Sequence, residues 1–181
     1  MMKLATVSAF LVVSMAMAGC GQGALRVTGQ DATLPVDEAS PAFLDRVASQ
    51  PGISQNDAMR GVLLLLDGQD GARDFRQRVE KLLARKIVPA WWEFDAKAAL
   101  TRGQLAYMVY QACKIQGGLI VTLTGPSGRY CLREMQYQRF MAAGMVNSRV
   151  TGMEFVAVMA RADAFLETGQ VPRTLSPVEG R

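Results

Sequence analysis

Ala99-Leu-Thr-Arg-Gly-Gln-Leu-Ala-Tyr-Met-Val-Tyr-Gln-Ala112 is the stretch that decides the fold, because a similar stretch follows at Arg149-Val-Thr-Gly-Met-Glu-Phe-Val-Ala-Val-Met-Ala-Arg-Ala162. When Thr101 is aligned with Thr151, apolar residues coincide at the i, i+3, i+4 and i+7 spacing of one helix face. These residues are Leu105, Met108, Val109 and Ala112 in the first stretch and Phe155, Val158, Met159 and Ala162 in the second. We therefore expect two helices of one repeated type, each with this stripe facing a core.

Both helices are expected to begin at a capping box, in which a hydroxyl accepts a hydrogen bond from a free backbone amide and the residue three positions on reaches back. The boxes are Thr101-x-x-Gln104 and Thr151-x-x-Glu154, and a fainter third box starts at Ser54. The third copy carries Ala58, Gly61, Val62 and Leu65 on the same stripe. The pattern predicts a mainly α-helical protein of repeated helix-turn-helix units. The simpler alternative is that these boxes and stripes are ordinary features of unrelated amphipathic helices.

The N-terminus has the pattern of a secretory signal. Lys3 precedes an apolar run over residues 4–17, and Ala18-Gly19-Cys20 follows. This end resembles the lipobox of bacterial lipoproteins, which implies that residues 1–19 are removed and that Cys20 is acylated as the new N-terminus. Gly21, a residue other than Asp, then implies the outer membrane. An uncleaved anchor helix, or an ordinary signal with a chance cysteine, is the alternative.

The rest of the chain divides by composition. Residues 20–39 mix polar residues, Gly and Pro without periodicity, and we expect a flexible tether there. Residues 40–168 form the expected helical domain, and 169–181, with Pro172 and Pro177, form a disordered tail. No stretch after the signal is long and apolar enough to span a bilayer, so membrane attachment is expected through the lipid alone.

Between the repeated stretches the periodicity predicts further elements. A helix opens at Ser40-Pro41, another runs over about 72–86, and a third over about 129–143. In the second of these we expect Arg78 to face solvent. Leu119-Ile-Val-Thr-Leu-Thr124 is β-branched and predicts one short strand or hairpin.

The aromatic segment Ala90-Trp-Trp-Glu-Phe-Asp95 is the first candidate for a site. Adjacent side chains of an extended segment face opposite ways, so one of Trp91 and Trp92 should be buried and the other at least partly exposed. An exposed indole suits a sugar face or a partner protein. The alternative is that both tryptophans fill gaps between helices.

Two cysteines remain after the signal, Cys113 and Cys131. In an oxidising compartment they are a possible disulfide, and the alternative is two separate buried thiols. The chain has no histidine to activate a cysteine nucleophile. It also has no metal-ligand cluster and no nucleophile elbow, so we expect a non-catalytic protein with no metal or cofactor.

The charge is mild. Lys3 is the only charged residue of the signal, and its loss leaves 19 of the 20 basic residues against 16 acidic ones. The basic residues are scattered along the chain, which argues against nucleic acid as a partner.

The repeated unit, a helix with a small apolar turn followed by a capped helix, resembles the S-layer homology repeat. The second helix of that family begins with an Ile-Thr-Arg-Ala-Glu-like motif. Leu100-Thr-Arg-Gly-Gln104 matches it well, Val150-Thr-Gly-Met-Glu154 in part, and Ile53-Ser-Gln-Asn-Asp57 weakly. The resemblance spans about residues 43–168 and implies a pseudo-threefold bundle of three repeats.

The resemblance also implies a function. In that family the arginine and acid of the motif, with aromatic residues nearby, line grooves that bind anionic cell-wall polysaccharide. Carried over by position, this nominates Arg102 and Gln104, with Trp91 or Trp92 as a stacking neighbour. We therefore expect an envelope lipoprotein that binds cell-wall or surface polysaccharide. The alternative is a lipoprotein that docks an envelope protein complex through the tryptophan segment and a helix face.

Overall fold

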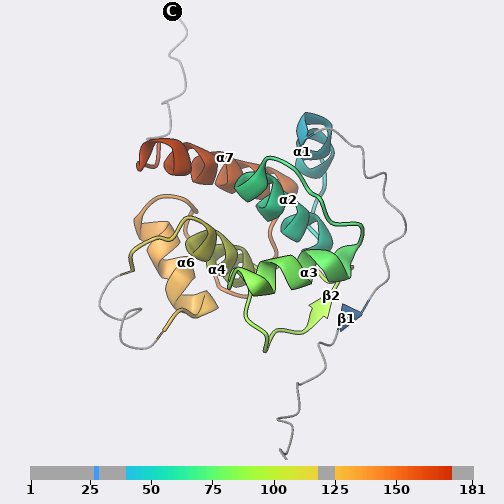
Figure 1. Ribbon diagram of the computed structural model, residues 1–181. Coiled ribbons are helices and arrows are strands. Elements are labelled where there is room, and N and C mark those ends of the chain that lie inside the picture. The colour runs from blue at the N-terminus through green and yellow to red at the C-terminus, as the bar shows by residue number, and fades with distance from the viewer. Residues whose placement is uncertain (1–26, 29–39, 118–124, 173–181) are drawn as a thin grey trace, which may run out of the picture.

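The computed structural model describes residues 27–28, 40–117 and 125–172 (Figure 1). These residues are mainly helical. The helices are α1 (Ser40–Ala48), α2 (Gln55–Asp67), α3 (Phe75–Ala84), α4 (Arg102–Ala112), α6 (Gly128–Tyr137) and α7 (Gly152–Thr168). The strands β1 (Val27–Thr28) and β2 (Phe94–Asp95) pair in parallel. The expected strand at 119–124 lies outside the described residues.

Helices α2, α4 and α7 form the centre of the fold, and each contacts the other two (Figure 1). The outer helices are distributed evenly around this centre: α1 packs on α7, α3 on α2, and α6 on α4. The apolar stripes predicted from the sequence face the core. Every stripe residue of α4 and α7 is buried, and in α2 only Leu65 is partly exposed.

The central helices begin at the predicted caps. The side chains of Ser54, Thr101 and Thr151 each accept a hydrogen bond from the backbone N–H three residues on. The Thr101 box is complete, because Gln104 Oε1 also accepts from the Thr101 N–H at 3.0 Å. At Thr151 the structure records only the hydroxyl half. The carboxylate of Glu154 lies 2.7 Å from the Arg102 guanidinium, and this charged partner is a stronger attraction than a backbone amide.

The residues just before these caps are joined by a closed cycle of three backbone hydrogen bonds. Leu100 N–H donates to Ile53 O at 2.7 Å, Ile53 N–H to Val150 O at 3.0 Å, and Val150 N–H to Leu100 O at 3.1 Å. All three side chains are buried at this point. The cycle therefore fixes the starts of α2, α4 and α7 around one centre.

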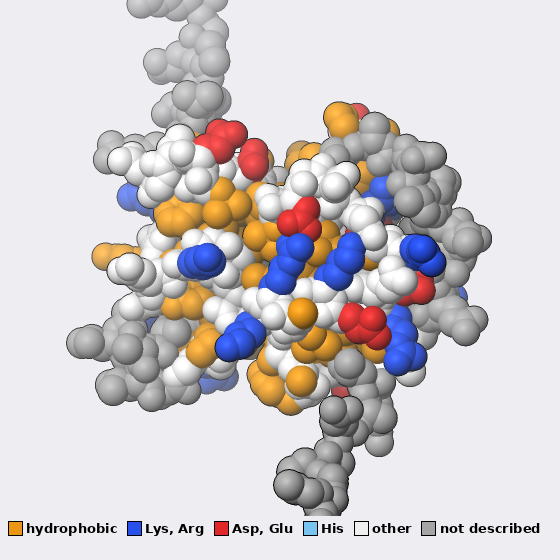
Figure 2. Space-filling view, in the orientation of Figure 1, with side chains coloured by type: hydrophobic (Ala, Val, Ile, Leu, Met, Phe, Trp, Pro, Cys, Tyr) orange, Lys and Arg blue, Asp and Glu red, His pale blue; other side chains and the backbone are white. Residues whose placement is uncertain are grey.

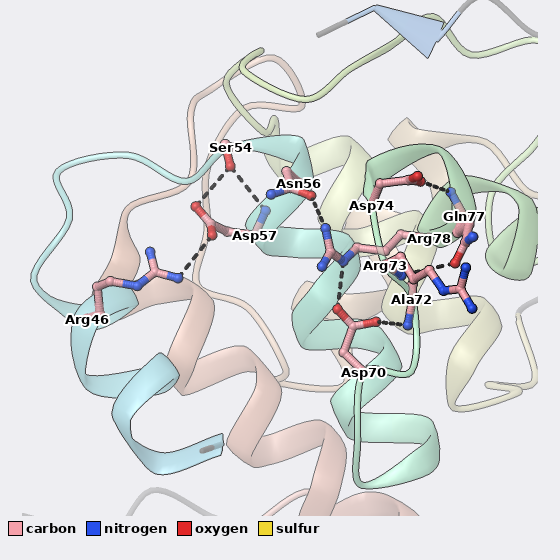
Figure 3. Close-up of polar contacts among 10 residues, drawn as sticks. All are labelled: Arg46, Ser54, Asn56, Asp57, Asp70, Ala72, Arg73, Asp74, Gln77 and Arg78. Atoms are coloured by element: carbon pink, nitrogen blue, oxygen red, sulfur yellow. Dashed lines mark hydrogen bonds and ion pairs between the residues drawn. The ribbon is translucent and has the colours of Figure 1, made fainter. Parts of the chain in front are cut away.

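The prediction that Arg78 faces solvent was wrong. Its side chain is 7% exposed; its Nε donates to Asp70 Oδ2 at 2.6 Å, and its Nη1 donates to Asn56 Oδ1 at 2.7 Å (Figure 3). Asp70 also accepts from the Ala72 N–H at 3.0 Å. The charge is tolerated inside because an opposite charge and an amide oxygen satisfy it there. This cluster fastens the turn between α2 and α3 to both helices.

The segment expected to be tether also differs from expectation at Val27 and Thr28. Val27 is in register with Phe94, and Thr28 with Asp95. The Thr28 hydroxyl donates to Phe94 O at 3.2 Å, and Ala96 N–H donates to Thr28 O at 3.0 Å. The remainder of 20–39 lies outside the described residues, as does 173–181 of the predicted tail. Within the described part of the chain no helix has both the length and the hydropathy to cross a membrane.

Candidate functional site

Arg102, the first residue nominated for ligand binding, is fully engaged inside the protein. Its side chain is 9% exposed. Its Nε donates to Glu154 Oε1 at 2.7 Å, Nη1 to Ala143 O at 2.9 Å, and Nη2 to Ala142 O at 2.7 Å. The guanidinium thus joins α7 to the segment that follows α6. All three of its nitrogens, Nε, Nη1 and Nη2, donate in these contacts.

Gly144 makes room for this arrangement. A Cβ built on Gly144 would lie 1.3 Å from Arg102 Nη1, so any other residue would displace the guanidinium. Gln104 is likewise used locally, since its Oε1 accepts from both the N–H and the hydroxyl of Thr101. Arg102 and Gln104 therefore hold the backbone in the contacts that the structure records.

The two tryptophans differ in exposure, as the sequence predicted, but the less exposed one is only half-buried. Trp91 is 71% exposed. Trp92 is half-buried, with its ring 5.3 Å from that of Tyr107 and 6.5 Å from that of Phe94. Arg102 lines a hollow of about 380 Å³, but the other lining residues are Met141, Ala142, Glu154, Ala157, Val158 and Arg161. The nominated residues are not brought together in this hollow.

A different groove carries unused polar groups. It has a volume of about 710 Å³ and lies between α6 and the segment 144–148. Arg129 and Arg133, four residues apart on α6, are both exposed at it. Within the described part of the chain neither guanidinium has an ion-pair or hydrogen-bond partner. Two neighbouring positive charges in a groove attract anionic ligands.

The floor and walls of this groove are held firmly. Leu132 is buried at its base, and Met145 is 77% exposed at its rim. Gln136 Nε2 donates to Gly144 O at 3.1 Å and to Ala142 O at 3.3 Å. Asn147 and Ser148 add polar groups to the lining. Because Ala142 O also accepts from Arg102, the buried arginine supports one wall of the groove from behind.

Sequence reasoning missed this groove. The i, i+4 spacing of Arg129 and Arg133 was a visible signal that both share one helix face. The facing wall at 144–148 gave no such signal, because its position depends on contacts with Arg102 and with Gly103, whose N–H donates to Val146 O at 2.9 Å.

The thiols of Cys113 and Cys131 are free and buried. Cys113 Sγ lies 3.9 Å from Ala162 O on α7. Burial raises the pKa of each thiol to about 12, since the thiolate would lose its hydration. Neutral, buried thiols of this kind are poor nucleophiles. The structure thus holds them as the two separate thiols of the alternative, and denaturation at pH 8 and pH 10 distinguishes these thiols from a disulfide. Cys20 lies outside the described residues.

Among the described residues no group of three or more Cys, Asp and Glu side chains is placed to hold a metal ion. Each ion pair recorded among the described residues joins a carboxylate to an arginine, as Asp70 pairs with Arg78. Comparison of the chain with protein-family models, with curated proteins and with solved structures finds no match in any of the three.

Proposed function

We propose that this chain is a lipid-anchored envelope protein that binds an acidic polysaccharide in the groove between α6 and residues 144–148. The observation that carries the proposal is the pair Arg129 and Arg133, two exposed guanidinium groups without partners in the described part of the chain, at one wall of a groove with a firm apolar base. Acidic polysaccharides offer carboxylate or phosphate groups along a chain, and an arginine pair binds such groups by charge-assisted hydrogen bonds.

The arrangement of the helices supports the S-layer homology reading of the fold. Each outer helix packs on a central helix that belongs to the preceding pair in the chain, with α1 closing onto α7. The first residue of each central helix is joined in the same cyclic order. It donates its backbone N–H to the segment before the next central helix, and α7 donates to the segment before α2. These bonds are Gln55 N to Ala98 O, Arg102 N to Ser148 O, and Gly152 N to Gln50 O. A pseudo-threefold arrangement of three helix pairs explains both features.

The proposal moves the ligand away from Arg102. In the S-layer homology family the motif arginine lines the groove. Here Arg102 donates hydrogen bonds to the carbonyls of Ala142 and Ala143 and so supports the groove wall. We propose that Arg129 and Arg133 supply the charge that meets the ligand. Leu132 and Val146 give an apolar surface on which a sugar ring can pack.

The test is co-sedimentation of the mature chain, residues 20–181, with protein-free cell-wall sacculi, and separately its binding to polygalacturonate beside neutral dextran. The variant Arg129→Ala/Arg133→Ala should stay in solution. The matched control is Arg73→Ala/Lys97→Ala, which removes the same charge from exposed side chains elsewhere. Because the contacts are ionic, wild-type binding should weaken as salt rises. If the two double variants bind alike, or if wild type binds none of these polymers, the proposal is wrong.

The anchor is tested separately. Mass spectrometry of the N-terminal peptide should show acyl groups on Cys20, and Cys20→Ser should move the protein from the membrane to the soluble fraction. A mature N-terminus without lipid would contradict this part of the proposal and leave the groove untouched.

A second candidate, a protein-docking lipoprotein, is favoured by one observation. An apolar groove of about 410 Å³ lies where α1, α2 and α7 meet, lined mainly by Leu44, Leu64, Leu65, Val156 and Met159. An amphipathic helix of a partner is the segment that such a groove accepts. Cross-linking from a photoreactive residue at position 160, compared with one at position 73, would capture that partner at the membrane.

A further inference from the structure

The loop between α3 and β2 presents an exposed apolar tip. Helix α3 ends at Ala84, Lys86 then takes a positive φ of 59°, and the buried side chains of Ile87 and Val88 hold the chain to the core. A turn follows, in which Trp92 N–H donates to Pro89 O at 3.2 Å. Trp91 stands at this turn and is 71% exposed.

This tip is held in place by its neighbours. The Trp91 ring meets that of Trp92 edge-on at 6.1 Å, and Trp92 packs on Tyr107 of α4 at 5.3 Å. Gln111 Nε2 donates to Lys86 O at 3.2 Å, which ties the start of the loop to the same helix. Trp91 is thus an exposed indole on a packed base, and tryptophan is a residue type enriched at interfaces.

The chain leaves the folded part toward its N-terminus beside this tip. Val27 is in register with Phe94, three residues after Trp91. Figure 1 shows β1, β2 and the loop from α3 at the lower edge of the molecule, with α7 at the opposite edge. Figure 2 shows hydrophobic side chains gathered at that lower edge.

The distance from this exit to Cys20 is short. Six residues, 21–26, lie between Cys20 and Val27, so the chain makes seven steps of at most about 3.6 Å each, or roughly 25 Å in all. Val27, which is fixed by its pairing with Phe94, therefore lies within roughly 25 Å of Cys20. When Cys20 is held at a bilayer, this short span keeps Val27 close to the bilayer, so that the edge that carries Trp91 can reach it.

The chemistry of the tip suits the interfacial layer of a membrane. Tryptophan collects there because its ring is apolar while its indole N–H remains hydrated. Pro89 and Ala90 beside it add apolar surface without charge. The charges around the tip nearly cancel, since exposed Lys86 and Lys97 are accompanied by exposed Glu93. The contact should therefore depend little on salt.

We propose that the loop 89–92 is a membrane-contact surface, and that Trp91 enters the interface of the bilayer that holds Cys20. The proposal rests on the lipid anchor proposed above. It restricts the orientation of the domain, because two points, the anchored N-terminus and Trp91, then contact the same surface.

The experiment supplies the anchor chemically, so that it does not depend on lipidation in the cell. The mature chain, residues 20–181, retains every element that the structure describes. Its Cys20 thiol is coupled to a maleimide lipid in phosphatidylcholine vesicles with brominated acyl chains, while buried Cys113 and Cys131 are protected from the reagent. The chain has two tryptophans, so Trp92→Phe leaves Trp91 as the only indole reporter.

On coupling, the emission of Trp91 should move to shorter wavelength and lose intensity through quenching by bromine, equally at low and high salt. The matched control is Trp91→Phe, in which Trp92, packed on Tyr107, should keep its emission. Circular dichroism establishes that both variants are folded, and the difference between wild type and Trp91→Phe gives the same answer without altering Trp92.

Unchanged Trp91 emission in coupled vesicles would overturn the proposal. A response of Trp91 to polygalacturonate in place of vesicles would also overturn it, and would assign the loop to the polysaccharide. Neither result bears on the Arg129 and Arg133 variants or on the mass of the N-terminal peptide, so a failure here is distinguishable from a failure of the proposed function.

Discussion

Replacing Arg102 by alanine tests whether this residue holds the fold or binds a ligand. The change removes the ion pair with Glu154 and two hydrogen bonds to the carbonyls of Ala142 and Ala143. Breaking a buried pair by deleting one partner costs about 3–5 kcal/mol. Here the remaining groups recover part of that loss, because the Glu154 side chain is 23% exposed and both alanines are exposed, so that water reaches them.

We therefore expect Arg102→Ala to lower the free energy of unfolding by about 2–3 kcal/mol, below the value for a fully buried pair. Urea denaturation of the mature chain, followed by circular dichroism, measures this directly, with the slope m unchanged. In a thermal scan the same loss should lower Tm by about 4–12 °C for a domain of this size.

The control is Arg73→Ala, which removes an exposed arginine and should change the free energy of unfolding by less than about 0.5 kcal/mol. A cycle with Glu154→Gln separates the ion pair from the carbonyl contacts. If Arg102→Ala is as stable as wild type and yet fails to pellet with sacculi, Arg102 is a ligand residue and the reasoning above is refuted.

Two further predictions follow from burial. Gly152→Ala should destabilise the protein by about 1–3 kcal/mol, because the new Cβ would lie 1.9 Å from Val47 O and push α7 away from α1. Urea denaturation measures this loss, with Met153→Ala as the control because Met153 is an exposed neighbour. Equal stability of the two variants would contradict the close contact. Burial raises the pKa of Cys113 and Cys131 from 9.0 to about 12, so the thiols lose their protons in the unfolded chain before they do in the folded one. The free energy of unfolding is therefore unaffected below pH 9. It falls as the pH rises towards 12, by about 1.4 kcal/mol per pH unit for each thiol. Denaturation at pH 8 and pH 10 should therefore show a loss about 2–3 kcal/mol larger in wild type than in Cys113→Ala/Cys131→Ala, and no such difference if the two cysteines form a disulfide.

The sequence predicted those features that depend on neighbours along the chain. The stripes of α4 and α7 and the caps at Ser54, Thr101 and Thr151 follow from helical periodicity and from hydrogen bonds three residues apart, and the structure has them. Gly169 ends the last helix with a φ of 72°, a left-handed conformation that glycine adopts readily. These are local effects, so a single sequence contains the information that sets them.

The features that were missed depend on residues far apart in the chain. Amphipathic spacing placed Arg78 outside, but its partners Asp70 and Asn56 lie 8 and 22 residues away. The pair between Arg102 and Glu154 spans 52 residues. The side of a helix on which an arginine lies can be read from periodicity, whereas the presence of a partner there depends on the tertiary fold.

The same limit applies to the motif arginine, whose contacts differ from one repeated stretch to the next. The positions aligned with Arg102 in the other two stretches are Gln55 and Gly152. Gln55 Oε1 accepts from the Asp95 N–H at 3.3 Å. At Gly152 there is no room for a side chain, because Val47 O occupies the space that a Cβ would take. Each first turn therefore fastens its neighbouring segment by a different device, an amide, a guanidinium or a direct backbone contact.

This difference has a consequence for any attempt to restore the motif. An arginine at position 152 would have to pass through Val47 O, so Gly152→Arg should separate α7 from α1 and cannot create a second site there. Only the turn at Arg102 both reaches across to another segment and leaves a groove with unpaired charges beyond it, within the part of the chain that the structure describes. The binding that we propose would then depend on α6 and the wall that Arg102 supports, while the contacts recorded at the other two turns hold the helices together.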